Sequence, residues 1–118
     1  MDPEVLEQLQ ALEPVFHHAE VGAGREVFEA MTSADYWEVG ASGRAYSRDF
    51  VIETLVHRYA QPHEDLWAIN DFAIRRLAED VWLATYELDQ DGRLSRRATI
   101  WRKSDSGWIA EYHQGTLQ

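Results

Sequence analysis

Cysteine is absent from the 118-residue chain, which excludes disulfide bonds, thiolate metal sites and thiol nucleophiles. No apolar run approaches the roughly 18 residues that a membrane-spanning helix needs. The segment Met1–Glu4 has neither the basic start nor the apolar stretch of a signal peptide. These absences predict one cytoplasmic domain, residues 1–118, without a membrane partner, whose stability comes from packing alone.

Basic residues are also scarce, since 11 Lys and Arg stand against 21 Asp and Glu and give a net charge of -10. Such an acidic protein repels phosphate backbones, so nucleic acid and anionic membranes are not expected as partners. We expect the acidic surface chiefly to aid solubility. Hydrophobic residues make up 45% of the chain and include five tryptophans, which is ample material for a core.

Three segments of the first half repeat their apolar residues at helical spacing. Asp2 is the predicted N-cap of the first segment, and Pro14 is expected to end or kink it. Residues 27–31 form the apolar stripe of a short second helix. Ser47 is predicted to cap a third helix that Pro62 stops.

Strand signals dominate the second half of the chain. Four β-rich runs, residues 66–77, 81–89, 94–103 and 108–116, are separated by hairpin turn signals. A short strand at residues 36–39 precedes the third helix, and the pair Arg75 and Arg76 breaks alternation as a bulge would. The pattern predicts an α+β fold, in which three N-terminal helices pack on a strongly curved antiparallel sheet.

Four local motifs sharpen this prediction: Glu38–Arg44, Leu83–Tyr86, Arg97–Trp101 and His113–Thr116. With the order of elements, they resemble the nuclear transport factor 2-like superfamily, also called SnoaL-like, and within it the family labelled domain of unknown function 4440. The resemblance implies a cone-shaped sheet around a pocket, and often dimerisation through the exposed sheet face. It implies no single chemistry, because relatives include isomerases, dehydratases, cyclases and scaffolding proteins.

The ligand-binding candidates are the polar and aromatic residues of strands that the cone would turn inward. They are Trp37, Glu38, Tyr86, Arg97, Thr99, Trp101 and Gln114. Glu38 and Arg97 are the central pair, because charges in an apolar cavity need partners. Either they orient a ligand, with Arg97 free to bind a carboxylate, or they form a buried structural ion pair.

The candidate catalytic residues are Asp71, Glu38 and His113. Under strict alternation Asp71 shares a face with Trp67 and Ile69. Turned inward, Asp71 would be a general base beside a carbonyl, as in the ketosteroid isomerase branch; turned outward, it is a solvent-facing acid. The sequence leaves both readings open.

The last strand presents the same choice of face. Its Trp108-led set, which includes Gln114, has the larger apolar content and is the predicted interior. His113 would then lie at a sheet edge or a dimer seam with a structural role.

The remaining histidines do not have the spacing of a metal site. His17 and His18 are adjacent and diverge on a helix, and His57 and His63 match no ligand pattern. We therefore expect no metal and no cofactor.

Taken together, the sequence predicts a homodimeric pocket protein for a small, largely apolar or aromatic molecule. One alternative is a non-enzymatic association module that uses the exposed sheet face. A second alternative is a proton-transfer enzyme of the isomerase or dehydratase kind, so whether the protein is an enzyme stays open.

Overall fold

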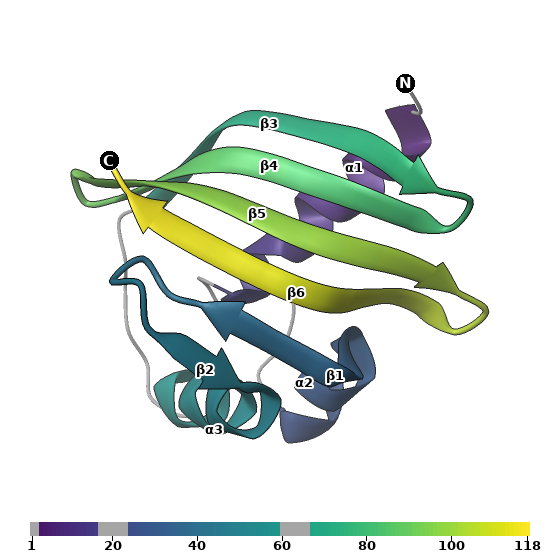
Figure 1. Cartoon of the computed structure of the whole chain (residues 1–118), viewed down its shortest axis with the longest axis horizontal. Coiled ribbons are helices and arrows are strands. Elements are labelled where there is room, and N and C mark those ends of the chain that lie inside the picture. Colours follow the sequence, from purple (N-terminus) through teal and green to yellow (C-terminus); the bar gives the residue numbers. More distant parts are fainter. Residues whose placement is uncertain (1–2, 17–23, 60–66) are drawn as a thin grey trace.

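A computed structural model describes residues 3–16, 24–59 and 67–118 and shows helices packed on a curved, six-stranded sheet (Figure 1). The elements in chain order are α1 (Pro3–Leu12), the 3-10 turn η1 (Glu13–Phe16), α2 (Arg25–Met31), β1 (Thr32–Val39), β2 (Ala45–Ser47), α3 (Arg48–Tyr59), β3 (Trp67–Ala78), β4 (Val81–Gln90), β5 (Arg93–Ser104) and β6 (Gly107–Leu117). The predicted α+β order is confirmed, and the four long strands agree with their predicted bounds to within one residue. None of the described helices is long and apolar enough to cross a membrane.

The sheet has the strand order β2-β1-β6-β5-β4-β3. Strands β3 to β6 form the predicted antiparallel meander, but β1 runs parallel to β6, so the sheet is mixed. Hairpin-linked neighbours must run antiparallel, whereas β1 and β6 are joined through most of the chain and escape this constraint. The short strand β2 was predicted as a loop, because three residues are too few to show a period.

Local signals set the ends of the helices where the structure describes them. The Ser47 side chain accepts a hydrogen bond of 3.2 Å from the Phe50 amide and caps α3, as predicted. Helix α1 ends at Leu12, and the chain continues as the 3-10 turn that contains Pro14. The predicted roles of Asp2 and Pro62 lie outside the described residues.

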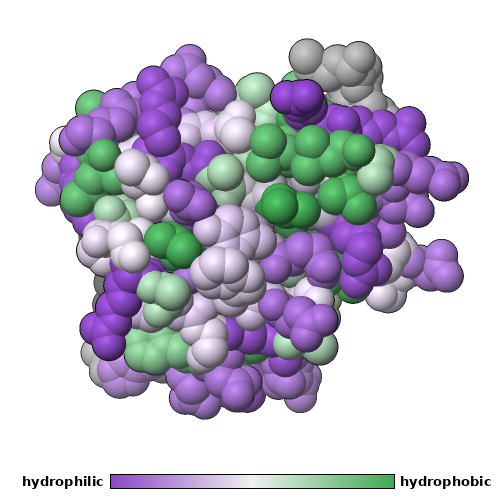
Figure 2. Space-filling model, viewed as in Figure 1, coloured by the Kyte–Doolittle hydropathy of each residue, from purple (hydrophilic) through white to green (hydrophobic). Residues whose placement is uncertain are grey.

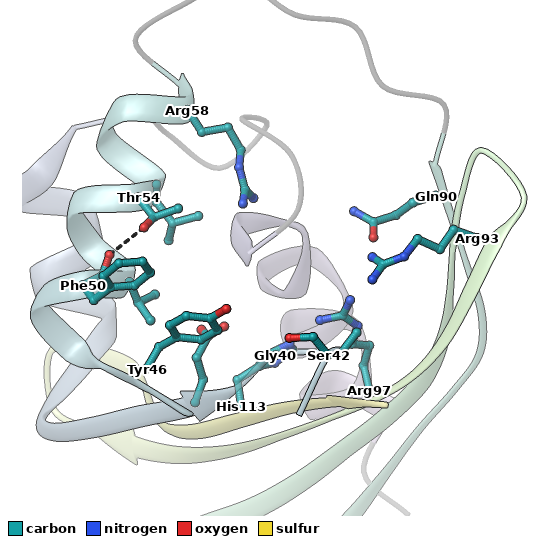
Figure 3. Close-up of a pocket in the computed structure, with 14 residues that line it drawn as sticks. Gly40, Ser42, Tyr46, Phe50, Thr54, Arg58, Gln90, Arg93, Arg97 and His113 are labelled. Atoms are coloured by element: carbon teal, nitrogen blue, oxygen red, sulfur yellow. Dashed lines mark hydrogen bonds between the residues drawn. The ribbon is translucent and has the colours of Figure 1, made fainter. Parts of the chain in front are cut away.

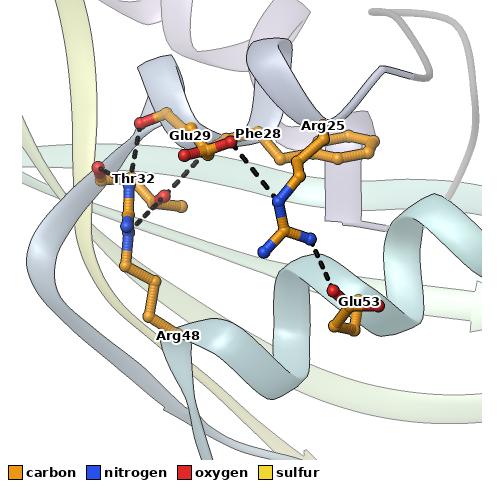
Figure 4. Close-up of polar contacts among 6 residues, drawn as sticks. All are labelled: Arg25, Phe28, Glu29, Thr32, Arg48 and Glu53. Atoms are coloured by element: carbon orange, nitrogen blue, oxygen red, sulfur yellow. Dashed lines mark hydrogen bonds and ion pairs between the residues drawn. The ribbon is translucent and has the colours of Figure 1, made fainter.

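A network of arginines ties α2, β1 and α3 together (Figure 4). Arg48 donates to the Thr32 hydroxyl at 3.1 Å and to the Glu29 carbonyl at 3.1 Å, and so satisfies carbonyls at the end of α2. Arg25 contacts the carboxylates of Glu29 at 3.4 Å and Glu53 at 2.7 Å. These contacts fix α3 beside the β1–β2 edge, where it forms one wall of a pocket.

The core lies between the inner face of the sheet and the helices. Its apolar members are Val5, Leu9, Phe28, Tyr36, Val51, Ile52, Leu55, Trp82, Ala84, Trp101 and Ala110. Figure 1 shows α1 crossing the β3–β6 meander, while α2 and α3 lie beside β1 and β2. Between the part of the sheet that α1 covers and the part beside α2 and α3, polar side chains of β1 and β5 occupy the inner face.

Two bulges decide which residues of β3 and β6 face that interior. Asp71 in β3 has a positive φ of 57° at a register shift, after which Phe72 instead of Asp71 turns inward. In β6, Tyr112 pairs with Ile100 but Ala110 pairs with Trp101, so Glu111 is the extra residue. Each bulge exchanges the two faces of its strand, and strict alternation fails there.

The broken alternation at Arg75 and Arg76 predicted a bulge in the first long strand. A register shift does follow Arg76, between Arg76 and Ala78. The shift that matters for the interior is the earlier one at Asp71, for which the sequence carries no signal.

Candidate functional site

The predicted site residues divide between the two faces of the sheet. Tyr86, Thr99 and Trp101 are buried on the inner face, and Glu38 and Arg97 line a pocket there. The five residues share the inner face of the sheet, but Tyr86, Thr99 and Trp101 are not among the described residues that line this pocket.

Two predicted ligand-binding residues lie on the outer face, so their placement in the cone was wrong. Trp37 is 48% exposed and packs on the Tyr112 ring, with centroids 4.8 Å apart. Gln114 is exposed and accepts a hydrogen bond of 2.7 Å from the Tyr112 hydroxyl. The Glu111 bulge explains Gln114. Trp108 and Ala110, which precede the bulge, face inward as predicted, whereas Tyr112 and Gln114, which follow it, lie on the outer face.

The same bulges correct the two catalytic candidates on β3 and β6. Asp71 is turned outward by its bulge, has a 75% exposed side chain and lies 3.9 Å from Arg96. The isomerase-like reading therefore loses its proposed base. His113, predicted at a sheet edge, is buried on the inner face and forms part of the pocket wall.

The pocket has a volume of about 580 Å³ and lies between α3, the β1–β2 edge, the β4–β5 hairpin and β6 (Figure 3). Its described lining residues are Glu38, Gly40, Ala41, Ser42, Tyr46, Phe50, Val51, Thr54, Leu55, Arg58, Gln90, Arg93, Arg97 and His113. This size suits a small organic molecule.

Arg97 is held in place by its neighbours on the sheet. Its Nε donates to the Ser95 hydroxyl at 2.9 Å. A Cβ on Gly115 would lie 2.6 Å from Nη1 of Arg97, so only glycine leaves room for the guanidinium against β6. Burial lowers the pKa of Arg97, and the nearby charges of Arg93 and Arg58 add to this effect, whereas Tyr86 and Glu38 oppose it.

Glu38 faces the same pocket from β1. The Tyr36 hydroxyl donates to its carboxylate at 2.8 Å. Burial raises the pKa of Glu38, while the Tyr36 hydrogen bond and the charges of Arg97 and Arg58 lower it. Among the ion pairs of the described residues there is none between Glu38 and Arg97, so the predicted structural ion pair is not formed.

Behind the pocket wall, three buried polar side chains form a hydrogen-bonded chain. The Thr99 hydroxyl is bonded to the Glu13 carboxyl on one side and lies 2.7 Å from Nδ1 of His113 on the other. Glu13, Thr99 and His113 are each at most 1% exposed. The chain runs from η1 through β5 to β6 and ends in the pocket wall.

Burial favours the neutral forms of Glu13 and His113, the two ends of this hydrogen-bonded chain. It raises the pKa of Glu13 to about 8, while the hydrogen bond from Thr99, the nearby indole of Trp101 and the charge of Arg97 oppose this rise. It lowers the pKa of His113 to about 3, and the charge of Arg97 adds to this effect. Near pH 7 Glu13 is therefore a neutral acid and His113 a neutral imidazole.

Sequence reasoning missed Glu13, Arg58 and Arg93. Glu13 is a lone acid among the apolar residues around Pro14, and that setting was the only signal of its burial. Arg58 and Arg93 follow no motif, and only the folded arrangement brings them to one pocket with Arg97. Within the described part of the chain no cluster of histidine and acidic residues is placed to hold a metal ion; His17, His18 and His63 lie outside it.

No family model and no curated protein sequence matches the chain. Solved structures do match. An NTF2-like protein from Cytophaga hutchinsonii superposes with a TM-score of 0.72 at 14% identity, over 100% of both chains. An NTF-2 like protein of unknown function from Silicibacter pomeroyi gives 0.71 at 20% identity, again over 100% of both.

A third similar structure is a putative Ca/calmodulin-dependent kinase II association domain from Exiguobacterium sibiricum, with a TM-score of 0.67 at 20% identity over 100% of this chain and 97% of that one. At such identities the likeness extends to the fold alone. The chain thus has the NTF2-like fold, which confirms the predicted fold. The narrower resemblance to the domain of unknown function 4440 family stays a prediction.

Proposed function

We propose that this protein binds a small organic anion with an aromatic or apolar body in the pocket between α3 and the sheet. The observation that carries the proposal is that the guanidinium groups of Arg58, Arg93 and Arg97 line one pocket of a protein with a net charge of -10. Guanidinium groups bind carboxylates and phosphates through paired, charge-assisted hydrogen bonds. The ligand that we infer is therefore a small, largely apolar or aromatic molecule, as the sequence predicts, that also carries a negative charge.

The opposite wall of the pocket suits the apolar part of such a ligand. The rings of Tyr46 and Phe50 stack with centroids 4.9 Å apart and planes at 11°. Figure 3 shows this ring pair across the pocket from Arg93 and Arg97. A flat carboxylic acid would place its ring by the aromatic wall and its carboxylate by the arginines.

Calorimetric titration with benzoate, benzamide and benzylamine tests the proposal, because the three probes share a ring and differ in charge. We expect benzoate to bind and the neutral and cationic probes to bind at least about tenfold more weakly. Arg97→Gln should weaken benzoate binding about tenfold or more, whereas Arg102→Gln, on the same strand but outside the pocket, should not. Equal binding of benzoate and benzamide would reject the anion site.

The outer face of the sheet supports a second role, self-association. Leu83 pairs with Ile100, Ile100 with Tyr112, and Tyr112 with Trp37. These four residues therefore form one row across β4, β5, β6 and β1. Figure 2 shows apolar side chains gathered on this face over the β3–β5 part of the sheet. Trp37 is exposed, and Leu83, Ile100 and Tyr112 are half-buried. Such a partly exposed apolar row on a broad sheet favours pairing with a second copy.

Sedimentation at micromolar concentration tests this homodimer. We expect twice the mass of the chain for the wild type and a single chain for Trp37→Glu, because a buried unpaired carboxylate opposes association. The variant Gln10→Glu, at an exposed position of α1 away from the row, is the control, because it adds the same single negative charge. A wild-type protein that sediments as one chain contradicts the dimer without affecting the pocket.

A further inference from the structure

Two of the pocket arginines, Arg93 and Arg97, lie on the same face of β5, with the buried side chain of Ser95 between them. Gln90 is the register partner of Arg93 on β4. Figure 3 shows the side chains of Gln90, Arg93 and Arg97 on one side of the pocket, with both guanidinium groups turned toward its interior. Two cations and an amide are thus gathered near the β4–β5 hairpin.

The donors of these three side chains are largely unused. Within the described part of the chain, the side chains of Arg93 and Gln90 have no hydrogen-bond acceptor, and Arg97 engages only its Nε, with Ser95. The carboxylate of Glu38, in the same lining, forms no ion pair with either arginine there. Both Nη groups of Arg97 and the whole guanidinium of Arg93 therefore remain to bind a ligand.

The number of these donors distinguishes between classes of anion. A carboxylate has two oxygens and one negative charge, so a single guanidinium satisfies it through paired hydrogen bonds. Arg97 alone would do this and would leave Arg93 without a counter-charge. A phosphate monoester has three free oxygens and about two negative charges at neutral pH, so it matches two guanidinium groups in both donors and charge.

Mutual repulsion of the two arginines points the same way. Burial lowers the pKa of Arg97, and the nearby charge of Arg93 adds to this effect. Arg97 is half-buried and held by Ser95 against Gly115, whereas Arg93 is exposed. A group with two negative charges between them would neutralise both cations, whereas a group with one charge would leave one cation uncompensated.

We propose that the pocket prefers a phosphate monoester of a compact aromatic or apolar alcohol, with its phosphate held between Arg93 and Arg97 and Gln90 as a further donor. Arg93 sets this preference, since Arg97 by itself suits a carboxylate. The body of the ester lies by the rings of Tyr46 and Phe50, as for any anion of the proposed site. The inference rests on the proposed anion site and narrows its ligand to one class.

Calorimetric titration at pH 7.5 with phenyl phosphate, phenyl sulfate, benzoate and inorganic phosphate tests this preference. Phenyl sulfate has the tetrahedral head group and the ester oxygen of phenyl phosphate but only one negative charge. We expect phenyl phosphate to bind at least about tenfold more tightly than phenyl sulfate or benzoate, because it alone matches both guanidinium groups. Inorganic phosphate, which has no ring, should bind at least about tenfold more weakly than phenyl phosphate.

The variant Arg93→Gln separates the roles of the two arginines. It should weaken the binding of phenyl phosphate about tenfold or more and that of benzoate by less than about threefold. Arg97→Gln should weaken both ligands about tenfold, and Arg102→Gln, outside the pocket, should weaken neither. Because Arg93 is exposed, Arg93→Gln should unfold at the wild-type temperature, so that a loss of binding is not a loss of folding.

Phenyl phosphate that binds no more tightly than phenyl sulfate or benzoate overturns the inference; if benzoate still binds, the proposed anion site stands. If none of the four probes binds, the anion site falls as well. Inorganic phosphate that binds as tightly as phenyl phosphate overturns the preference for an ester. Equal losses of benzoate and phenyl phosphate binding in Arg93→Gln overturn the assignment of the preference to Arg93.

Discussion

Replacing Glu13 by glutamine should remove most of the pH dependence of folding between pH 6.5 and 8. Glu13 is fully buried, and burial raises its pKa from 4.5 to about 8. Raised above its unfolded value, the carboxyl contributes stability that is fully present below pH 4.5 and is lost as the pH rises through 8. Glutamine has the same shape but no proton to lose, so its contribution is constant.

The size of the effect follows from two opposing groups. His113, whose pKa falls from 6.5 to about 3, contributes stability that is present above pH 6.5 and lost as the pH falls. Between pH 4.5 and 6.5 the two slopes cancel. From pH 6.5 to 8 only Glu13 acts, and one and a half pH units at about 1.4 kcal/mol each give a loss of about 2 kcal/mol.

Urea unfolding followed by tryptophan fluorescence measures this at pH 6.5 and pH 8.5. We expect the wild type to lose about 2 kcal/mol more than Glu13→Gln between the two values. Glu7→Gln, an exposed carboxyl on the preceding helix, should keep the wild-type loss. Equal losses in the wild type and Glu13→Gln would refute the reasoning, because they would mean that Glu13 is ionised already at pH 6.5.

Three further predictions concern residues that position others. Gly115→Ala should displace the Arg97 guanidinium and weaken benzoate binding about tenfold, yet cost under about 1 kcal/mol of stability, because a flexible tip can move; unchanged binding would contradict the packing. Arg48→Ala should cost about 1–3 kcal/mol in urea unfolding by leaving carbonyls at the end of α2 without a donor, whereas exposed Arg75→Ala should cost under about 0.5. Asp71→Gly should raise the unfolding free energy by up to about 1 kcal/mol, because glycine adopts the φ of 57° at this position without strain. A loss above about 1 kcal/mol would show that the contact of Asp71 with Arg96 contributes more than this strain costs.

The sequence predicted the strands well because their turns carry strong local signals. Asp91, Gly92 and Gly107 adopt positive φ at the predicted hairpins, and those turns fix the ends of β4, β5 and β6. Thr99 and Trp101 were placed inward correctly because β5 has strict alternation between its turns. Regular stretches bounded by glycine turns can thus be predicted residue by residue.

The sequence could not predict which residues of β3 and β6 face inward, because a bulge inserts a single residue and leaves little trace in the composition. Asp71 and Glu111 look like ordinary strand residues, yet each reverses the alternation beyond it. That reversal brings His113 to the pocket and turns Gln114 away. Glu13 escaped prediction for another reason: its partner Thr99 is 86 residues away, and burial of a carboxyl is decided by such distant contacts.

The contrast between an acidic surface and a cationic pocket bears on which anions the proposed site would admit. The net charge of -10 repels a polyanion along its whole length, whereas a small anion inside the pocket is close only to its lining. At physiological salt, charges act over about 8 Å, so the arginines outweigh the distant acids for a ligand within their reach. Among the described residues of that lining, Arg58, Arg93 and Arg97 face one carboxylate, Glu38. The same charge distribution that argues against nucleic acid as a partner therefore favours a compact organic acid as the ligand.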